Sequence, residues 1–299
     1  MSILVCGANG QLGCEISRLI GQGYAEIGPI PARYLGAELV KTDVDELDIT
    51  DALAVESFVT ESGFDLIINC AAMTNVDACE EHEEAAYRIN ALGAENLAKA
   101  AAKAYAKIVH ISTDYVFSGD LASDRIESDI PDPQSAYGRT KLASELLVAQ
   151  ANPRHFIIRT AWLYGYVGKN FVKTIMELAR KNGFIKVVSD QFGNPTSAND
   201  LAYEILRIAE TESYGVYHCT NKGSCSWYEF ACEIVDLAAI TCERIPCTTE
   251  EFPRPAKRPA FSSLHNKRLE DGIGDEMRPW REALANFFEN LPELEGKPV

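Results

Sequence analysis

The sequence predicts an α/β fold in which helices cover both faces of a parallel sheet. Short apolar runs alternate with helical patterns through the first half of the chain. The apolar runs are continuous rather than alternating with polar residues, which is typical of strands buried on both faces. Strands and helices that follow each other in this way form βαβ units. The predicted class is therefore a doubly wound parallel sheet of the Rossmann type, followed by a smaller C-terminal substrate-binding lobe.

The elements of the first half follow each other at short intervals. Strands are predicted at residues 3–6, 65–70, 107–112 and 155–160, with a second strand between 26 and 33 and a short third one before Asp48. Helices are predicted at residues 11–20, 51–61, 83–103 and 136–150. Together these elements predict a first domain over residues 1–160.

The pattern loosens after residue 160. Helices are predicted at 171–182, 199–210 and 226–239, and residues 250–263 are irregular and rich in Pro, Arg and Lys. This predicts a second lobe over 161–299 at the carboxyl edge of the strands, where open α/β sheets bind ligands, with some elements returning to the sheet. The end of the chain, residues 293–299, is expected to fray.

The composition argues against several classes of partner. The formal net charge of −16 argues against binding to nucleic acid or to an anionic membrane. The apolar runs are too short to span a membrane and no signal peptide is visible, so we expect a cytoplasmic protein. The nine cysteines include no CxxC pair, and Cys79 and His82 lack the second pair of a zinc site, so no metal is predicted.

Three glycines mark a dinucleotide site. Gly7, Gly10 and Gly13 follow the first predicted strand directly and open the first helix. Glycines at this spacing let the backbone turn tightly and approach a pyrophosphate, which then lies at the helix N-terminus.

The sequence leaves the adenosine contacts open. The segment from 26 to 33 does not end in an acid, so either the ribose is bound in another way or Arg33 meets a 2′-phosphate. NADPH and NADH therefore both remain possible cofactors. Asp48 and Ile49 are placed to meet the adenine edge, but Asp48 is equally suited to capping the next helix.

Tyr137 and Lys141 form the sharpest chemical signal. Residues i and i+4 share a helix face, so the phenol and the ammonium project together. A nearby cation lowers the pKa of a phenol towards the range in which acid–base catalysis operates. Thr113 ends the preceding predicted strand, where its hydroxyl can donate to the same substrate carbonyl. Asn69-Cys-Ala-Ala72 ends the strand before that.

These motifs resemble the extended short-chain dehydrogenase/reductases. Within that superfamily the chain closely resembles the dTDP-4-dehydrorhamnose reductase family, in the stretches STDYVFSG, YGRTKLASE, RTAWLYG and DQFGNPT. The resemblance runs from residue 1 to about 285. It implies reduction of the C4 ketone of a dTDP-hexose by NADPH or NADH, in the biosynthesis of nucleotide sugars for cell-surface polysaccharides.

The resemblance also assigns residues to roles. It implies catalysis by Thr113, Tyr137 and Lys141, with Lys141 lowering the pKa of Tyr137. Asp48 and Ile49 remain the expected adenine contacts. With them, the full set of cofactor contacts is Gly7, Gly10, Gln11, Leu12, Gly13, Asp48, Ile49, Ala71, Ala72, Tyr137 and Lys141. The substrate contacts are Thr113, Tyr115, Trp162, Asn170 and Arg258. Two alternatives stay open, because Trp162 also suits a core aromatic and Arg258 an ordinary exposed arginine.

One departure from related enzymes narrows the chemistry. Related dehydratases carry an Asp-Glu pair after the threonine, whereas here Asp114 is followed by Tyr115, which favours simple reduction. The alternatives are an epimerase or dehydratase of the same superfamily, or a non-catalytic subunit like the regulatory subunit of methionine adenosyltransferase. The chain is expected to be a monomer or a homodimer. Glu15 lies where some relatives bind a metal at a subunit contact, but one glutamate on a surface helix predicts no metal.

Overall fold

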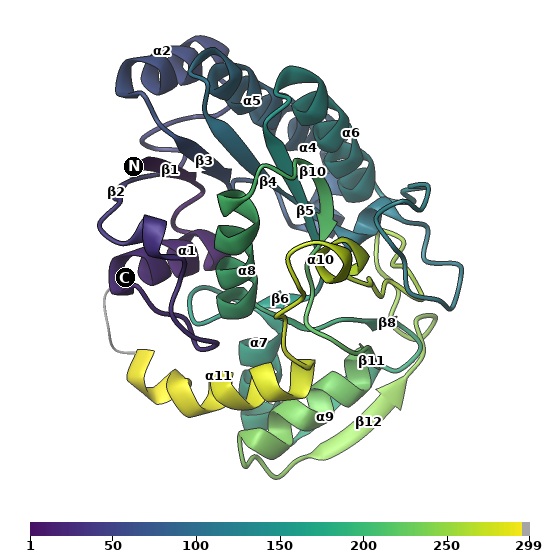
Figure 1. The fold of residues 1–299 in the computed structure, drawn as a ribbon. Helices are drawn as coiled ribbons and strands as arrows, with labels where there is room; N and C mark the ends of the chain where they lie inside the picture. The colour runs from purple at the N-terminus through teal and green to yellow at the C-terminus, as the bar shows by residue number, and fades with distance from the viewer. Residues whose placement is uncertain (295–299) are drawn as a thin grey trace.

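Six parallel strands form the main sheet of the computed structural model, which describes residues 1–294 (Figure 1). Their order is β2-β1-β3-β4-β5-β10, and every neighbouring pair is parallel. The strands are β1 (Ser2–Cys6), β2 (Glu38–Thr42), β3 (Leu66–Asn69), β4 (Lys107–Thr113), β5 (His155–Thr160) and β10 (Gly215–His218). The predicted doubly wound parallel sheet is confirmed.

Helices cover both faces of this sheet, as Figure 1 shows. One face packs against α1 (Gln11–Gln22) and α8 (Ala198–Glu210). The other face packs against α2 (Ala52–Ser62), α5 (Ala94–Lys103) and α6 (Ala136–Ala151). Successive side chains of a strand point to opposite faces, so Ile3 and Leu4 enter different cores, which explains why the strands read as continuous apolar runs.

The strand order reverses at β1. The chain passes from β1 to β2 on one side and then crosses to β3 on the other. Ligands of open α/β sheets bind at such a switch point, outside the carboxyl ends of the strands. The turn after β1 and the ends of β3 and β4 therefore meet where a site is expected.

The prediction of a strand between residues 26 and 33 is wrong. Only an isolated bridge from Tyr24 to Pro29 and a 3₁₀ turn, η1 (Ala32–Tyr34), lie there. Pro29 and Pro31 have no N–H to donate to a sheet, which disfavours a strand. The second strand is β2, and the residue that follows it is Asp43.

Arg33 lies at the amino ends of the strands, away from the carboxyl ends where the site is expected. Its Nη1 donates to the carbonyl of Glu210 at 3.5 Å, at the C-terminal end of α8. Because α8 leads into β10, that end of the helix lies beside the amino ends of the strands. The interpretation of Arg33 as a ligand of a 2′-phosphate is therefore wrong.

The predicted long helix over 83–103 is interrupted. It consists of α4 (Glu83–Tyr87), a π-helical turn, η2 (Arg88–Gly93), and α5, and a short helix, α3 (Val76–Glu81), precedes it. Cys79 is fully buried in α3, and residues 1–294 contain no cluster of side chains suited to a metal ion.

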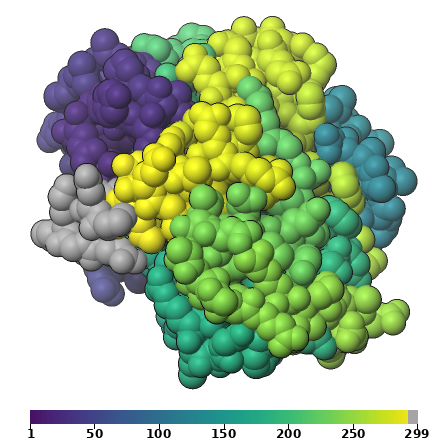
Figure 2. All heavy atoms as spheres, turned by 90° about the horizontal axis from the view of Figure 1, so that it is seen from below, coloured from purple at the N-terminus to yellow at the C-terminus, as the bar shows by residue number. Residues whose placement is uncertain are grey.

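The second lobe has a core of its own. The helices α7 (Phe171–Asn182), α9 (Trp227–Leu237) and α11 (Trp280–Leu294) pack around it. In the view from below, α11 is the yellow helix that lies between the purple N-terminal segment and the green second lobe (Figure 2). The remaining strands pair as β7 (Phe184–Val188) with β12 (Glu243–Cys247), β6 (Leu163–Tyr164) with β9 (Thr196–Ser197), and β8 (Phe192–Gly193) with β11 (Cys225–Ser226).

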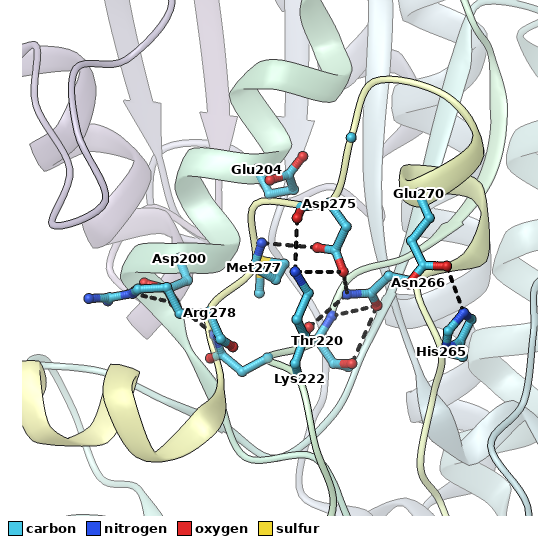
Figure 3. A network of polar contacts seen from close by, with 12 residues as sticks. Asp200, Glu204, Thr220, Lys222, His265, Asn266, Glu270, Asp275, Met277 and Arg278 are labelled. Atoms are coloured by element: carbon cyan, nitrogen blue, oxygen red, sulfur yellow. Dashed lines mark hydrogen bonds and ion pairs between the residues drawn. The ribbon is translucent and has the colours of Figure 1, made fainter.

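A network of ion pairs and hydrogen bonds joins the C-terminal segment to the elements around the main sheet (Figure 3). Arg278 pairs with Asp200 of α8, and Asn266, which precedes α10 (Lys267–Asp271), donates to the carbonyl of Thr220 at 2.8 Å. Since β10 also joins the sheet, the second half of the chain contributes to both cores. The division at residue 160 stays a prediction, and residues 295–299 of the expected fraying end lie outside the described residues.

No helix within residues 1–294 is both long enough and apolar enough to cross a membrane.

Candidate active site

A cavity of about 510 Å³ opens at the carboxyl ends of the strands. It is enclosed by the turn after β1, the ends of β3, β4 and β5, helix α6 and the start of α7. Most of the predicted site residues line it, namely Gly10, Gln11, Leu12, Gly13, Ala72, Thr113, Tyr115, Tyr137, Lys141, Trp162 and Asn170. Residues that are far apart in the sequence thus meet in one place.

The glycine turn fits a pyrophosphate. Gly7 has φ +70°, and a Cβ there would lie 2.6 Å from the backbone nitrogen of Ala71. A Cβ on Gly13 would lie 2.3 Å from the carbonyl oxygen of Gly7, so this glycine lets α1 close on the turn. Gly10 is the N-cap of α1 and offers no side chain to the first N–H groups. The N-terminus of α1 therefore faces the cavity with N–H donors that have no partner within residues 1–294, as an anionic ligand requires.

A buried polar network lies under the cavity. Lys141 is 2% exposed, and its Nζ donates to the carbonyl of Ile111 at 2.5 Å and lies 3.4 Å from Nε2 of His110. Burial lowers the pKa of Lys141 to about 8 and holds the pKa of His110 well below its usual value. His110 is therefore neutral, and Lys141 carries the charge of this network at neutral pH.

The contacts of His110 fix its tautomer. Nδ1 accepts from the Asn69 amide at 3.1 Å, because the amide oxygen of Asn69 already accepts from the backbone of Ala71. Nε2 then donates to the Ser144 hydroxyl at 2.8 Å, and that hydroxyl donates to the Lys141 carbonyl. The network ties β3 and β4 to α6, the helix that carries Tyr137.

Tyr137 and Thr113 both line the cavity, and the Thr113 side chain lies close enough to Tyr137 to favour its phenolate form. Burial raises the pKa of Tyr137 above its usual value, and Lys141 is not among the groups whose charge shifts that pKa. The expectation that Lys141 lowers this pKa is therefore not met, because the ammonium is directed at the Ile111 carbonyl instead. At neutral pH the phenol carries its proton.

Asp114 lies directly behind Thr113. Its Oδ1 accepts from the Thr113 hydroxyl at 2.9 Å, while its buried Oδ2 has no hydrogen-bond partner among residues 1–294. Burial raises the pKa of Asp114 to about 6. The hydroxyl of Thr113 is thus held beside that of Tyr137 by a carboxyl group that the sequence did not single out for this task.

The opposite wall is aromatic. The indole of Trp162 stacks on that of Trp227, with ring centroids 3.4 Å apart and planes 6° from parallel. A Cβ on Gly193 would lie 2.5 Å from the Trp162 ring, so glycine makes room for it. Trp162 has φ +46°, a left-handed conformation that costs energy in a bulky residue and is concentrated at functional sites. Trp162 is therefore a cavity wall rather than a purely core aromatic.

Two residues join this wall to the glycine turn. Asn170 caps α7 by accepting from the Lys173 backbone N–H, and its amide donates to the Gln11 side chain at 3.1 Å. Lys169 precedes it, lines the cavity and is exposed. Lys169 and Trp227 are cavity residues that the sequence analysis missed. A basic residue directly before the cap of a cavity-facing helix was the available signal for Lys169.

Asn90 is a further residue near the site that the sequence analysis did not identify. It lies in the π-helical turn and is 1% exposed. Its amide oxygen accepts from the Met73 backbone N–H at 2.7 Å, and its amide nitrogen donates to the Met73 carbonyl at 3.1 Å. It also donates to Thr140 of α6 at 3.1 Å. Turns of this kind are frequent at functional sites. Here the turn joins the loop after β3 to the helix that carries Tyr137 and Lys141.

Some predicted residues lie outside the cavity lining. Asp48 is exposed and accepts from Thr50, whereas the next helix is capped by Asp51. Ile49 is buried in the core beside Gly93. The placement of Asp48 and Ile49 against the adenine thus receives no support from the cavity. Gly7 and Ala71 shape the turn from behind rather than line the cavity.

Arg258 and Glu15 are both engaged elsewhere. Arg258 pairs with Asp77 at 3.0 Å, close enough to Tyr115 for its charge to favour the phenolate there, although burial raises the pKa of Tyr115 overall. Glu15 is 3% exposed, pairs with Arg18 and accepts from Asn199 at 2.5 Å. Glu15, expected on a surface helix, lies on the face of α1 that packs on α8, and this packing buries its side chain.

Comparison with known proteins agrees with this geometry. The family described as the RmlD substrate binding domain matches residues 1–292. The chain belongs to this family. A relative, a dTDP-4-dehydrorhamnose reductase from Aggregatibacter actinomycetemcomitans, is 38% identical over 297 residues, covering 95% of this chain and 97% of its own length.

Solved structures of dTDP-4-dehydrorhamnose reductases superpose closely on this chain. The structure of a dTDP-4-dehydrorhamnose reductase from Clostridium acetobutylicum is 50% identical, has a TM-score of 0.91 and covers 98% of this chain and 100% of that chain. The structure of a dTDP-4-dehydrorhamnose reductase from Bacillus anthracis, in complex with NADP, is 39% identical with a TM-score of 0.90, covering 97% and 99%.

Proposed function

We propose that this chain is a dTDP-4-dehydrorhamnose reductase, which reduces the C4 ketone of dTDP-4-dehydro-L-rhamnose to dTDP-L-rhamnose with NADPH or NADH. Full-length similarity to reductases of that name supports the substrate, and the relative in complex with NADP supports the cofactor. The product serves the biosynthesis of rhamnose-containing polysaccharides. The observation that carries the proposal is that Thr113, Tyr137 and Lys141 meet in the cavity that the glycine turn opens into.

The residues that would bind the cofactor surround the start of α1. The N–H groups of Gln11, Leu12 and Gly13, in the first turn of α1, would bind the pyrophosphate, because they follow Gly10, which provides no capping side chain. Lys141, buried and positively charged below about pH 8, would bind the nicotinamide ribose. When bound, NAD(P)H supplies the hydride for the ketone carbon.

Tyr137 would supply the proton. Its pKa is raised by burial, so the phenol is protonated at neutral pH, which is the form that a reduction needs. It would donate to the ketone oxygen as negative charge develops there, which is general acid catalysis. Thr113 would orient the ketone, since its hydroxyl lies beside the phenol and is itself positioned by Asp114.

The aromatic wall would bind the sugar nucleotide. Trp162 and Trp227 present a flat apolar surface opposite the polar network, and such surfaces pack against sugar and base rings. Lys169 and the N-terminus of α7 lie at the same side of the cavity and would favour the diphosphate. Tyr115 lines the cavity beside Tyr137, and Arg258 would contribute its charge from behind Tyr115.

An assay of cofactor oxidation tests this proposal. The purified protein, mixed with dTDP-4-dehydro-L-rhamnose and NADPH or NADH, should oxidise one cofactor for each dTDP-L-rhamnose formed, followed by absorbance and by chromatography of the sugar nucleotide. A protein that retains NAD and converts sugar nucleotides without net oxidation would be an epimerase or a dehydratase, and the proposal would fail.

A further inference from the structure

The end of β2 lies against the glycine turn, a contact that the sequence analysis did not predict. Thr42 pairs in register with Cys6, so β1 and β2 end side by side. The Ala8 N–H donates to the Thr42 carbonyl at 3.0 Å, which fastens the glycine turn to the end of β2. The next residue, Asp43, is thereby brought against the dinucleotide turn.

The carboxylate of Asp43 has a fixed position. Its Oδ2 accepts from the backbone N–H of Asn9, inside the glycine turn, at 3.2 Å. Its Oδ1 accepts from the N–H of Val44 at 2.9 Å, and its own N–H donates to Glu46. Asp43 is half-buried, so part of its side chain remains accessible beside the turn.

The charges around this position are mostly negative. Four of the six residues from 43 to 48 are acidic. Arg33, the cation that the sequence analysis offered for a 2′-phosphate, lies at the amino edge of the sheet beside Glu210. Lys41, on β2 itself, is the remaining cation close in the chain.

In dinucleotide-binding folds of this type, an acid after the second strand accepts a hydrogen bond from the ribose 2′-hydroxyl of NAD, and an arginine nearby accommodates the 2′-phosphate of NADP. A carboxylate at that point repels a phosphate, and juxtaposed like charges weaken binding strongly. We infer that Asp43 makes this chain select NADH over NADPH. The inference rests on the proposed function for its biological meaning, but it concerns nucleotide binding alone.

Direct binding measurements test the choice of nucleotide separately from the proposed reductase activity. The Kd values of NADH and of NADPH are measured on the protein without sugar nucleotide, by fluorescence of the bound nicotinamide. We expect NADH to bind at least about tenfold more tightly, since like charges at such a position cost at least about 1.4 kcal/mol. Asp43→Asn and Asp43→Ser should narrow that ratio to about threefold or less, mainly by improving NADPH binding.

Asp45→Asn is the matched control. It removes the same charge from an exposed neighbour two residues along and should leave the ratio unchanged. Equal binding of the two nucleotides, or tighter NADPH, by the wild type would overturn the inference while leaving the reductase proposal intact. If Lys41 recruits a 2′-phosphate, NADPH binds more tightly and Lys41→Gln removes that preference. An unchanged ratio in both Asp43 variants would exclude Asp43 as the cause, and failure to bind either nucleotide would overturn the reductase proposal as well.

Discussion

The two walls of the cavity differ in how their residues are held. The sheet wall is a closed polar network in which His110, Ser144 and Lys141 are each buried and hydrogen-bonded. The lobe wall consists of the stacked rings of Trp162 and Trp227, one of them on a left-handed backbone. The residues proposed for proton chemistry thus lie at the end of β4 and on α6, which the polar network ties together, while the second lobe supplies the substrate surface. Precise geometry matters most for the first task and surface shape for the second.

The largest effect is expected from the sheet wall. Tyr137→Phe removes the proposed proton donor and should lower kcat by about 10²–10⁴-fold, because general acid catalysis contributes an amount of this order. Steady-state kinetics with the sugar nucleotide measure it, and Kd for the cofactor should stay near the wild-type value. Tyr87→Phe, on an exposed tyrosine, is the control. A Tyr137→Phe variant with near-native kcat would remove the phenol from the mechanism.

The buried charge of Lys141 should lower the free energy of unfolding, although the proposed function requires it. Its folded-state pKa of about 8 lies below the ordinary 10.5, so the unfolded chain binds more protons between these pH values. The penalty for burying the charge is fully present below pH 8 and disappears as pH rises to 10.5. At about 1.4 kcal/mol for each pKa unit, it is on the order of 3 kcal/mol.

Lys141→Met should therefore make the protein without ligands more stable at pH 7 while activity is lost. Urea unfolding at pH 7 and at pH 10 measures the free energy of unfolding of both proteins, and the advantage of the variant should shrink at the higher pH. A variant that is less stable than the wild type at pH 7 would show that the ammonium contributes to folding through its bond to Ile111.

A smaller, different effect is expected from the lobe wall. Trp227→Ala removes the ring on which Trp162 stacks and should raise KM for the sugar nucleotide by about tenfold, given the usual value of an aromatic pair plus its buried area. The same kinetic series should give kcat within about threefold of the wild type. Phe184→Ala, an exposed aromatic of the same lobe, is the control. A fall in kcat with unchanged KM would contradict the division of labour between the two walls.

The smallest expected effect is a pH dependence. Lys141 is charged below its pKa of about 8 and neutral above it. If the charged form binds the cofactor, kcat/KM for the cofactor should fall to about half by pH 8 and continue to fall at higher pH, since this parameter reports the free enzyme. Lys141→Arg keeps the charge and should move the fall to higher pH. A flat profile up to pH 9 would separate Lys141 from cofactor binding.

The same two regions show how far sequence reasoning reaches. The strand at 155–160 and the helix at 171–182 were predicted with their observed bounds, because continuous apolar runs and 3.6-residue periodicity report burial directly. The strand β2 lies at the sheet edge with partly exposed residues, so it carries no such run, and Asp43 was missed with it. The stack of Trp227 on Trp162 joins residues 65 positions apart, which no local pattern reveals.

The tautomer and charge state of the buried network were beyond prediction for a related reason. The i, i+4 spacing of Tyr137 and Lys141 correctly indicated a shared helix face. The ammonium of Lys141, however, donates to the carbonyl of Ile111 and lies beside His110, and both of these residues belong to the neighbouring strand β4. The pKa of Tyr137 is consequently set by burial. Spacing determines which side chains share a face, whereas the groups that approach from other elements determine their acidity.

The most direct test of the account is the fate of the hydride. With NADPH or NADH deuterated at the transferable C4 position and dTDP-4-dehydro-L-rhamnose, the wild-type protein should form dTDP-L-rhamnose that carries deuterium at the sugar C4, detected by mass spectrometry and NMR. Tyr137→Phe should form the same labelled product far more slowly. Product without deuterium, or no product from a protein that binds the cofactor, would contradict the assignment of the cavity to carbonyl reduction.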